Sequence, residues 1–186
     1  MIDNRLKLLI LQHPHERKAA FSTAAACAAA LAHCKIAVGL SWPNLARAAG
    51  EPAEPGRWAV LYLGSARPQG DDEILAVDRH GAALPGAAAL LRRLDGAVLL
   101  DGTWREAKTL WWRNPWLLRL HRLVLNPRAP ARLGPVRREP RGEALSTLEA
   151  AALVLRHAET GPQAAEALLA ALDRLVAGAA PVSGPV

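Results

Sequence analysis

The sequence is poor in the residues that build the commonest metal and nucleotide sites. Its two cysteines, Cys27 and Cys34, lie seven positions apart in a helical pattern and cannot close a structural zinc site by themselves, and its histidines are scattered. It contains no Walker loop, no Gly-x-Ser-x-Gly and no Gly-x-Gly-x-x-Gly. We therefore expect no metal, two cysteines that are small core residues rather than ligands or a disulfide, and neither P-loop phosphoryl transfer nor nucleophilic-serine chemistry.

Long apolar spans and targeting segments are missing as well. No stretch has the length and apolarity of a membrane span, and no signal-peptide pattern is present, so we expect a cytoplasmic protein without a membrane partner. The sequence also has no internal repeat and no domain linker. Its 186 residues are enough for one domain with a substantial core.

What the sequence has in excess is arginine. The formal net charge is +6, the pI is about 10.1, and arginine far outnumbers lysine. The planar guanidinium group suits phosphates and base edges, which favours a polyanionic partner. An arginine-rich and alanine-rich composition is also typical of proteins from GC-rich genomes, so composition alone does not establish that partner.

Strand-like and helix-like segments alternate along the chain. Apolar runs predict strands at residues 6–11, 36–40, 58–63, 74–77, 97–100 and 122–125. Helical patterns occupy residues 22–33, a short stretch that starts near 41, then 85–94, 103–112, 115–120, a stretch from 146, and 163–176. This alternation predicts a single α/β domain over residues 1–178, with a mostly parallel sheet and helices on both faces, followed by a flexible tail at 179–186.

The most informative stretch is residues 98–107. An apolar run ends at Asp101, turns at Gly102 and enters a helical pattern in which Thr103 and Glu106 form a Thr-x-x-Glu capping box. Strands of α/β sheets deliver polar groups to the carboxyl edge of the sheet, where ligands bind. A capped helix explains the glycine, the threonine and the glutamate, but it does not explain the aspartate. Asp101 is therefore a candidate functional residue.

Other candidates have ordinary structural explanations beside them. Gly64-Ser65 follows a predicted strand, where a glycine lets the backbone approach a ligand closely. Ser146-Thr147-Leu148-Glu149 is a second capping box. Thr23 lies at a helix start and is explained by capping, and His13 and Glu16 are explained by a solvated loop.

An aromatic and basic stretch follows the Asp101 segment. Tryptophans alternate with cations at Trp104, Arg105, Lys108, Trp111, Trp112, Arg113, Trp116, Arg119 and Arg122, and further arginines follow at Arg128, Arg132, Arg137, Arg138 and Arg141. Indoles offer stacking surfaces and guanidinium groups offer phosphate contacts, which favours single-stranded or looped RNA. The alternative is that Trp111 and Trp116 pack in the core while the arginines form a solvated face.

Three segments together resemble the DTW-domain family, which takes its name from an Asp-x-Thr-Trp signature. They are Leu11-Gln12-His13-Pro14-His15-Glu16 with Ser22-Thr23, then Asp101-Gly102-Thr103-Trp104, then Leu145-Ser146-Thr147-Leu148-Glu149-Ala150. Arg137-Arg138-Glu139-Pro140 resembles the arginine and proline segment that the family has before the last motif. The resemblance covers roughly residues 6–158, with order and spacing kept.

This resemblance implies a tRNA-uridine aminocarboxypropyltransferase. Such enzymes use S-adenosylmethionine as co-substrate and form 3-(3-amino-3-carboxypropyl)uridine. The family is related to a ribosomal RNA enzyme with a SPOUT-like, trefoil-knotted α/β fold. The sequence lacks the cysteine-rich, zinc-binding segment that many members carry ahead of the His-Pro-x-Glu motif, which leaves open how RNA is held. The partner expected is tRNA, with monomer and homodimer both open.

The resemblance and the chemistry of the donor also suggest roles for single residues. Asp101 is the candidate base that accepts the proton of uridine N3. The candidate donor-binding residues are Gly64, Ser65, Gly102, Thr103, Trp104, Ser146, Thr147 and Glu149. The candidate RNA-binding residues are His13, Glu16, Thr23, Arg105, Arg113, Arg137 and Arg138.

Three other functions stay open at this point. A SPOUT-type RNA methyltransferase would use the same donor and transfer a different carbon. A non-catalytic RNA-binding protein would bind RNA without modifying it. A relative in fold alone would act on a small molecule.

Overall fold

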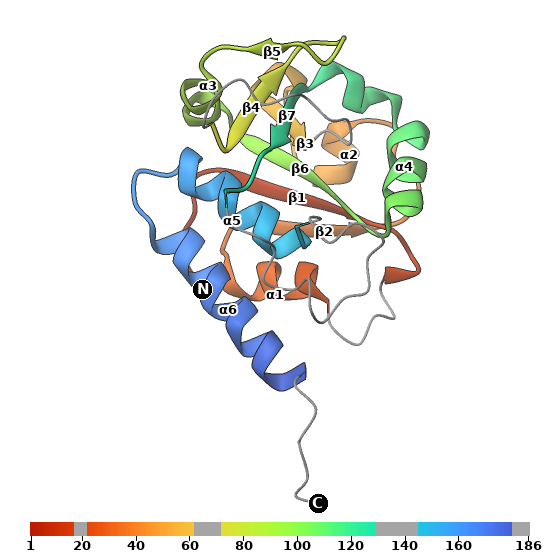
Figure 1. Cartoon of the computed structure of the whole chain (residues 1–186). Helices are drawn as coiled ribbons and strands as arrows, with labels where there is room; N and C mark the ends of the chain where they lie inside the picture. The colour runs from red at the N-terminus through yellow and green to blue at the C-terminus, as the bar shows by residue number, and fades with distance from the viewer. Residues whose placement is uncertain (17–21, 62–71, 129–144, 180–186) are drawn as a thin grey trace, which may run out of the picture.

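The computed structural model describes residues 1–16, 22–61, 72–128 and 145–179. Within these ranges the strands form one sheet in the order β2-β1-β6-β3-β7-β4-β5 (Figure 1). Neighbouring strands are parallel from β2 to β7, and β4 pairs antiparallel with both β7 and β5. The strands are β1 (Lys7–Gln12), β2 (Cys34–Val38), β3 (Trp58–Leu61), β4 (Ile74–Val77), β5 (Ala83–Leu84), β6 (Gly96–Asp101) and β7 (His121–Leu125). The predicted α/β class with a mostly parallel sheet is confirmed.

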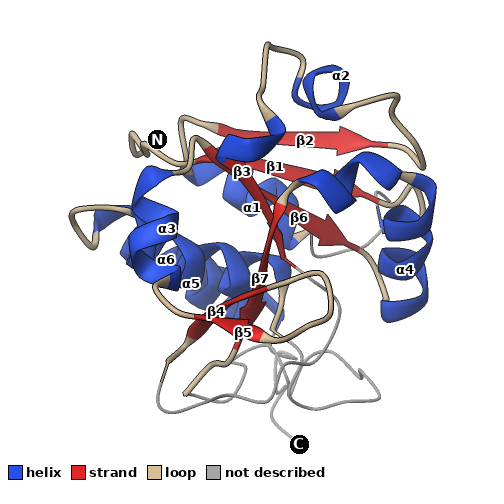
Figure 2. Cartoon of the chain, turned by 90° about the horizontal axis from the view of Figure 1, so that it is seen from above, coloured by secondary structure: helices blue, strands red, loops and turns tan. Residues whose placement is uncertain are grey.

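Helices cover both faces of the sheet, as predicted (Figure 2). Leu8 and Ile10 of β1 share a core with α1 (Thr23–Ala30), α3 (Ala87–Arg93), α5 (Thr147–Ala158) and α6 (Gln163–Ala179). Leu9 and Leu11 face the opposite core, which is built with α2 (Leu45–Ala49), α4 (Trp104–Arg113) and the 3-10 turn η3 (Pro115–Arg119). A further 3-10 turn, η2 (Pro55–Arg57), leads into β3. Because both faces are covered, β1 and β6 are almost continuously buried.

The pairing of β1 with β6 positions the candidate site. The two strands run parallel, with Gln12 in register with Asp101, so both strands end at the same edge of the sheet. His13 follows β1 directly, and α4 begins three residues after β6 ends. The α5 helix begins at the same edge, since the side chain of Thr147 contacts that of Asp101.

Several predicted boundaries differ from the observed ones. Helix α1 ends at Ala30 rather than near residue 33, because Leu31 is extended and bridges to Ile2. Helix α3 begins at Ala87 with Gly86 as its N-cap, so Pro85 precedes the helix. Strand β5 was not predicted, since two residues are too few to show a period. Both capping boxes, Thr103 with Glu106 and Ser146 with Glu149, are confirmed.

Some expectations concern residues outside the described ranges. The connection from β7 to α5 includes residues 129–144, through which a knot would have to be traced, so the knot stays a prediction. The predicted tail at 179–186 also lies outside, apart from Ala179, which ends α6. Among the helices that the structure does describe, none is both long enough and apolar enough to cross a membrane.

Candidate functional site

Asp101 lies at the centre of the candidate site, at the carboxyl end of β6. Its side chain accepts two hydrogen bonds, one on each oxygen. Nε2 of Gln12 donates to Oδ2 at 2.8 Å, and the hydroxyl of Thr147 donates to Oδ1. Asp101 is only 4% exposed, so these two bonds fix the carboxylate in a largely dry environment.

The backbone around Asp101 explains why the sequence brings these groups together. The amide of His13 donates to the carbonyl of Asp101 at 2.9 Å, which holds the chain leaving β1 against the chain leaving β6. A Cβ atom on Gly102 would lie 2.8 Å from Cβ of Glu106 and 3.4 Å from Cβ of His13. Any side chain at position 102 would therefore push the first turn of α4 away from the site.

Two capped helix N-termini meet at this edge. In the first, the amide and the hydroxyl of Thr103 both donate to Oε2 of Glu106 at 2.9 Å. In the second, the amide and the hydroxyl of Ser146 donate to Oε2 of Glu149 at 2.9 and 2.7 Å. The positive ends of two helix dipoles therefore lie near Asp101, an arrangement that favours an anionic group in a ligand.

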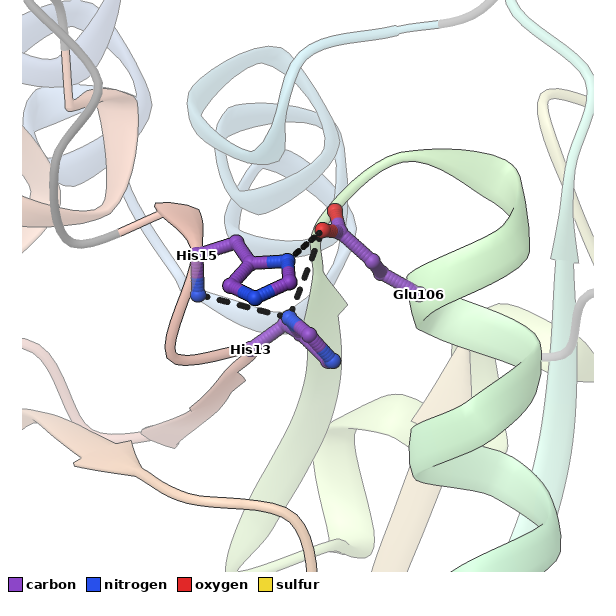
Figure 3. Close-up of side chains that lie close together, drawn as sticks. All are labelled: His13, His15 and Glu106. Atoms are coloured by element: carbon purple, nitrogen blue, oxygen red, sulfur yellow. Dashed lines mark hydrogen bonds and ion pairs between the residues drawn. The ribbon is translucent and has the colours of Figure 1, made fainter.

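His13, His15 and Glu106 form a second polar cluster beside Asp101. Their side chains point toward one another from the end of β1 and the first turn of α4 (Figure 3). Oε1 of Glu106 lies 3.3 Å from Nδ1 of His13 and 3.2 Å from Nδ1 of His15. Burial acts to raise the pKa of Glu106, but hydrogen bonds from Thr103, the charge of His13 and the bond from His15 outweigh it. The pKa of Glu106 therefore lies below its usual value.

The structure brings together predicted residues from all three motif segments. They are His13, Asp101, Gly102, Thr103, Ser146, Thr147 and Glu149. Glu16 lies in the adjoining turn, where its amide donates to the carbonyl of His13 at 3.0 Å. Thr23 is buried as the first residue of α1. Gly64, Ser65, Arg137 and Arg138 lie outside the described residues.

The tryptophans divide between core and surface. Trp116 is buried and donates through Nε1 to the carbonyl of Trp42 at 3.0 Å, whereas Trp104 and Trp112 are 47% and 78% exposed. Trp104, Lys108 and Trp112 follow one another at intervals of four along α4, so they share a face of that helix. Nζ of Lys108 lies 5.2 Å from the centre of the Trp104 ring. Arg105 and Arg113 are also exposed on α4.

Three residues of the site were missed by the sequence analysis in these roles. Gln12 was part of a motif but was given no role, although it contacts Asp101 directly. His15 was likewise given no role, and Glu106 was assigned only the role of a helix cap. A His-x-His spacing was the available signal for His15, but its partner Glu106 is 91 positions away in sequence.

A known protein family matches most of the chain. A family model described as DTW domain matches residues 1–179. No curated protein and no solved structure was found to match the chain.

Proposed function

Because the chain belongs to the DTW domain family, we propose that it modifies tRNA as an aminocarboxypropyltransferase of the cytoplasm. Family membership is consistent with a tRNA-modifying transferase. The finer proposal is that it moves the 3-amino-3-carboxypropyl group of S-adenosylmethionine to N3 of a uridine. The observation that carries it is the contact between Asp101 and Thr147, which joins two of the three motif segments at a sheet edge.

The proposed reaction is a displacement in which N3 of the uridine forms a bond to the γ-carbon of the donor's amino-acid arm. The bond from that carbon to sulfur breaks, its electron pair stays on sulfur, and methylthioadenosine leaves. The N3 proton must be lost, and Asp101 is the group proposed to accept it. Each carboxylate oxygen has about two lone pairs. The bonds from Gln12 and Thr147 use one on each oxygen, so a lone pair remains on each for the proton.

The choice of carbon would follow from how the donor is positioned. All three carbons on a sulfonium are electrophilic, so the product depends on which carbon faces the base. We propose that the first turns of α4 and α5 hold the donor's carboxylate, with Thr103, Ser146 and Thr147 beside it. Glu149 is proposed to face the donor's ammonium group, and Trp104 to stack on adenine or on the uridine. A SPOUT-like arrangement with a trefoil knot remains part of the same proposal.

The exposed face of α4 supports RNA as the acceptor. It starts next to Asp101 and carries two exposed indoles and the cations Arg105, Lys108 and Arg113. Exposed aromatic rings with interleaved cations suit unstacked bases and phosphates. An RNA loop on this face would have its bases within reach of the sheet edge.

The test is nucleoside mass spectrometry of tRNA from a strain that lacks the gene. The strain would be complemented with the wild-type protein, with Asp101→Asn or with Asp3→Asn, which changes an exposed aspartate that pairs with His33. We expect the wild-type protein and Asp3→Asn to restore the modified uridine. With Asp101→Asn, we expect the rate at which it forms to fall by about 100-fold or more. Full restoration by Asp101→Asn, with the variant folded by thermal melting, would rule out Asp101 as the base.

A further inference from the structure

The cluster of His13, His15 and Glu106 has the composition and spacing of a metal site. Two imidazole nitrogens and one carboxylate oxygen all lie within 4.8 Å of one another. Two histidines and one glutamate are a ligand set found in catalytic zinc sites, where water or substrate completes the coordination. The cluster stands at the edge of the sheet beside Asp101, because His13 is bonded to the backbone of Asp101.

Two of the three separations between ligand atoms match those around a tetrahedral ion. Ligand atoms about 2.0 Å from a tetrahedral metal are separated from each other by about 3.3 Å. Oε1 of Glu106 lies 3.3 Å from Nδ1 of His13 and 3.2 Å from Nδ1 of His15. Both separations are longer than the common N–H···O hydrogen bond of about 2.9 Å.

The ligand atoms of the cluster converge on one another. The amide of His15 donates to Nδ1 of His13 at 3.4 Å. Nδ1 of His13 and Nδ1 of His15 both face Oε1 of Glu106, so a single cation between the three atoms would contact all of them.

The surroundings of the cluster orient its ligands. The second carboxylate oxygen of Glu106 accepts from the amide and the hydroxyl of Thr103, which directs the first oxygen toward the histidines. His13 is buried and tied to β6 through its backbone. Such outer hydrogen bonds are the usual means by which proteins fix metal ligands. The side chain of His15 is 82% exposed and nevertheless lies against Glu106, which leaves an open path for an ion to enter.

We propose that His13, His15 and Glu106 bind a divalent transition-metal ion, with zinc the class that this ligand set suits. No metal was expected from the sequence, because the histidines are scattered and Glu106 lies 91 positions from His15. Three protein ligands leave one position for water or for an oxygen of the bound substrate. The proposal concerns ion binding and stands apart from aminocarboxypropyl transfer, so either can fail without the other.

The test is titration of the chelator-treated, full-length protein with Co²⁺, followed by visible absorption and by competition with Zn²⁺. We expect one ion per chain, with the intense absorption of tetrahedral Co²⁺, displaced by Zn²⁺. Binding should weaken by about tenfold or more in His15→Ala, since outer-ligand changes alone already cost 10–100-fold. His15 is exposed, so this variant is expected to fold; thermal melting checks that it does.

The matched control is His33→Ala. His33 is another exposed histidine, with Nε2 3.1 Å from a carboxylate oxygen of Asp3, and no third ligand accompanies that pair in the described residues. Its removal should leave the Co²⁺ spectrum and affinity unchanged. The proposal is overturned if wild type and His15→Ala bind Co²⁺ equally, or if His33→Ala weakens binding as much as His15→Ala does.

Discussion

The hydroxyl of Thr147, the first residue of α5, donates a hydrogen bond to Oδ1 of Asp101, the last residue of β6. The two residues are 46 positions apart in sequence. The contact ties the start of one helix to the end of a central strand at the edge where parallel sheets bind ligands. A substitution of Thr147 should therefore change the hydrogen bonding of the Asp101 carboxylate.

Replacing Thr147 with valine tests this coupling. Thr147→Val keeps the shape of the side chain but leaves Oδ1 of a buried carboxylate without its donor. We expect a loss of about 1–3 kcal/mol in the free energy of unfolding, measured by urea denaturation, together with reduced transfer activity. Thr147→Ser should keep most of both. Thr109→Val is the control, because Thr109 donates to the carbonyl of Arg105 within α4 and should affect activity little. Equal stability and activity in Thr147→Val and wild type would contradict the coupling.

The cap of α5 should matter for ligand binding as well as for stability. Ser146→Ala and Asn44→Ala each remove the side chain that accepts a backbone hydrogen bond at a helix start, and each should cost about 1 kcal/mol. Only Ser146 lies at the proposed donor site, where it also holds Glu149. Isothermal titration with S-adenosylmethionine should show weaker binding in Ser146→Ala and unchanged binding in Asn44→Ala. Equal affinities in the two variants would remove Ser146 from the donor site.

The exposed face of α4 should contribute to RNA affinity without contributing to stability. Trp112 is 78% exposed, and loss of one stacked base costs about 1–3 kcal/mol, so Trp112→Ala should weaken tRNA binding by roughly 5–150-fold. Leu118→Ala, at another exposed apolar side chain, should bind as wild type. Lys108→Met should reduce the slope of log affinity against log salt by about one phosphate contact. Filter binding at several salt concentrations measures all three, and unchanged affinity in Trp112→Ala would argue against stacking.

The two thiols should be unreactive in the folded protein. Both cysteines are free, and burial raises the pKa of Cys34 to about 12. Burial, with smaller contributions from Cys34 and Asp101, raises the pKa of Cys27 still further. At pH 8 a thiol reagent should label the native protein slowly and should find two thiols after denaturation. Cys27 is buried and Cys34 is partly buried, and rapid native labelling of either would contradict their raised pKa values.

The raised thiol pKa values also predict that the free energy of unfolding decreases at high pH. Above the ordinary thiol pKa of 9.0, the unfolded chain releases protons that the folded chain retains. The thiols' contribution to stability is therefore complete below about pH 9 and decreases as the pH rises toward 12. A double Cys27→Ala and Cys34→Ala variant should lose this part of the pH dependence.

Local sequence patterns predicted the parts of the fold that depend on neighbouring residues. The capping boxes at Thr103 and Ser146 were recognisable because each satisfies its own helix start within four residues. Both cysteines were expected to be core residues in a helical pattern, which is confirmed for Cys27, whereas Cys34 begins β2 and is only partly buried. The strand order was not predictable in this way, because β1 and β6 are neighbours only in three dimensions.

Contacts between distant segments also explain why the roles of Gln12, His15 and Glu106 were missed. Gln12 meets Asp101 across 89 positions, and His15 meets Glu106 across 91. No local period links such pairs, so their roles follow only from the register of β1 with β6. The place of Asp101 at the carboxyl edge of the sheet was predictable, because it ends an apolar run of strand length, and its role as the base stays a proposal.

The most direct test of aminocarboxypropyl transfer is to follow the methyl group and the carboxyl carbon of S-adenosylmethionine separately. Purified protein and unmodified tRNA would be incubated with S-adenosylmethionine labelled either on the methyl group or on the carboxyl carbon, and the RNA would be digested and counted. We expect the carboxyl label to enter a single modified uridine and the methyl label to stay out of the RNA. Methyl label in the RNA would instead show a methyltransferase and contradict the proposed function.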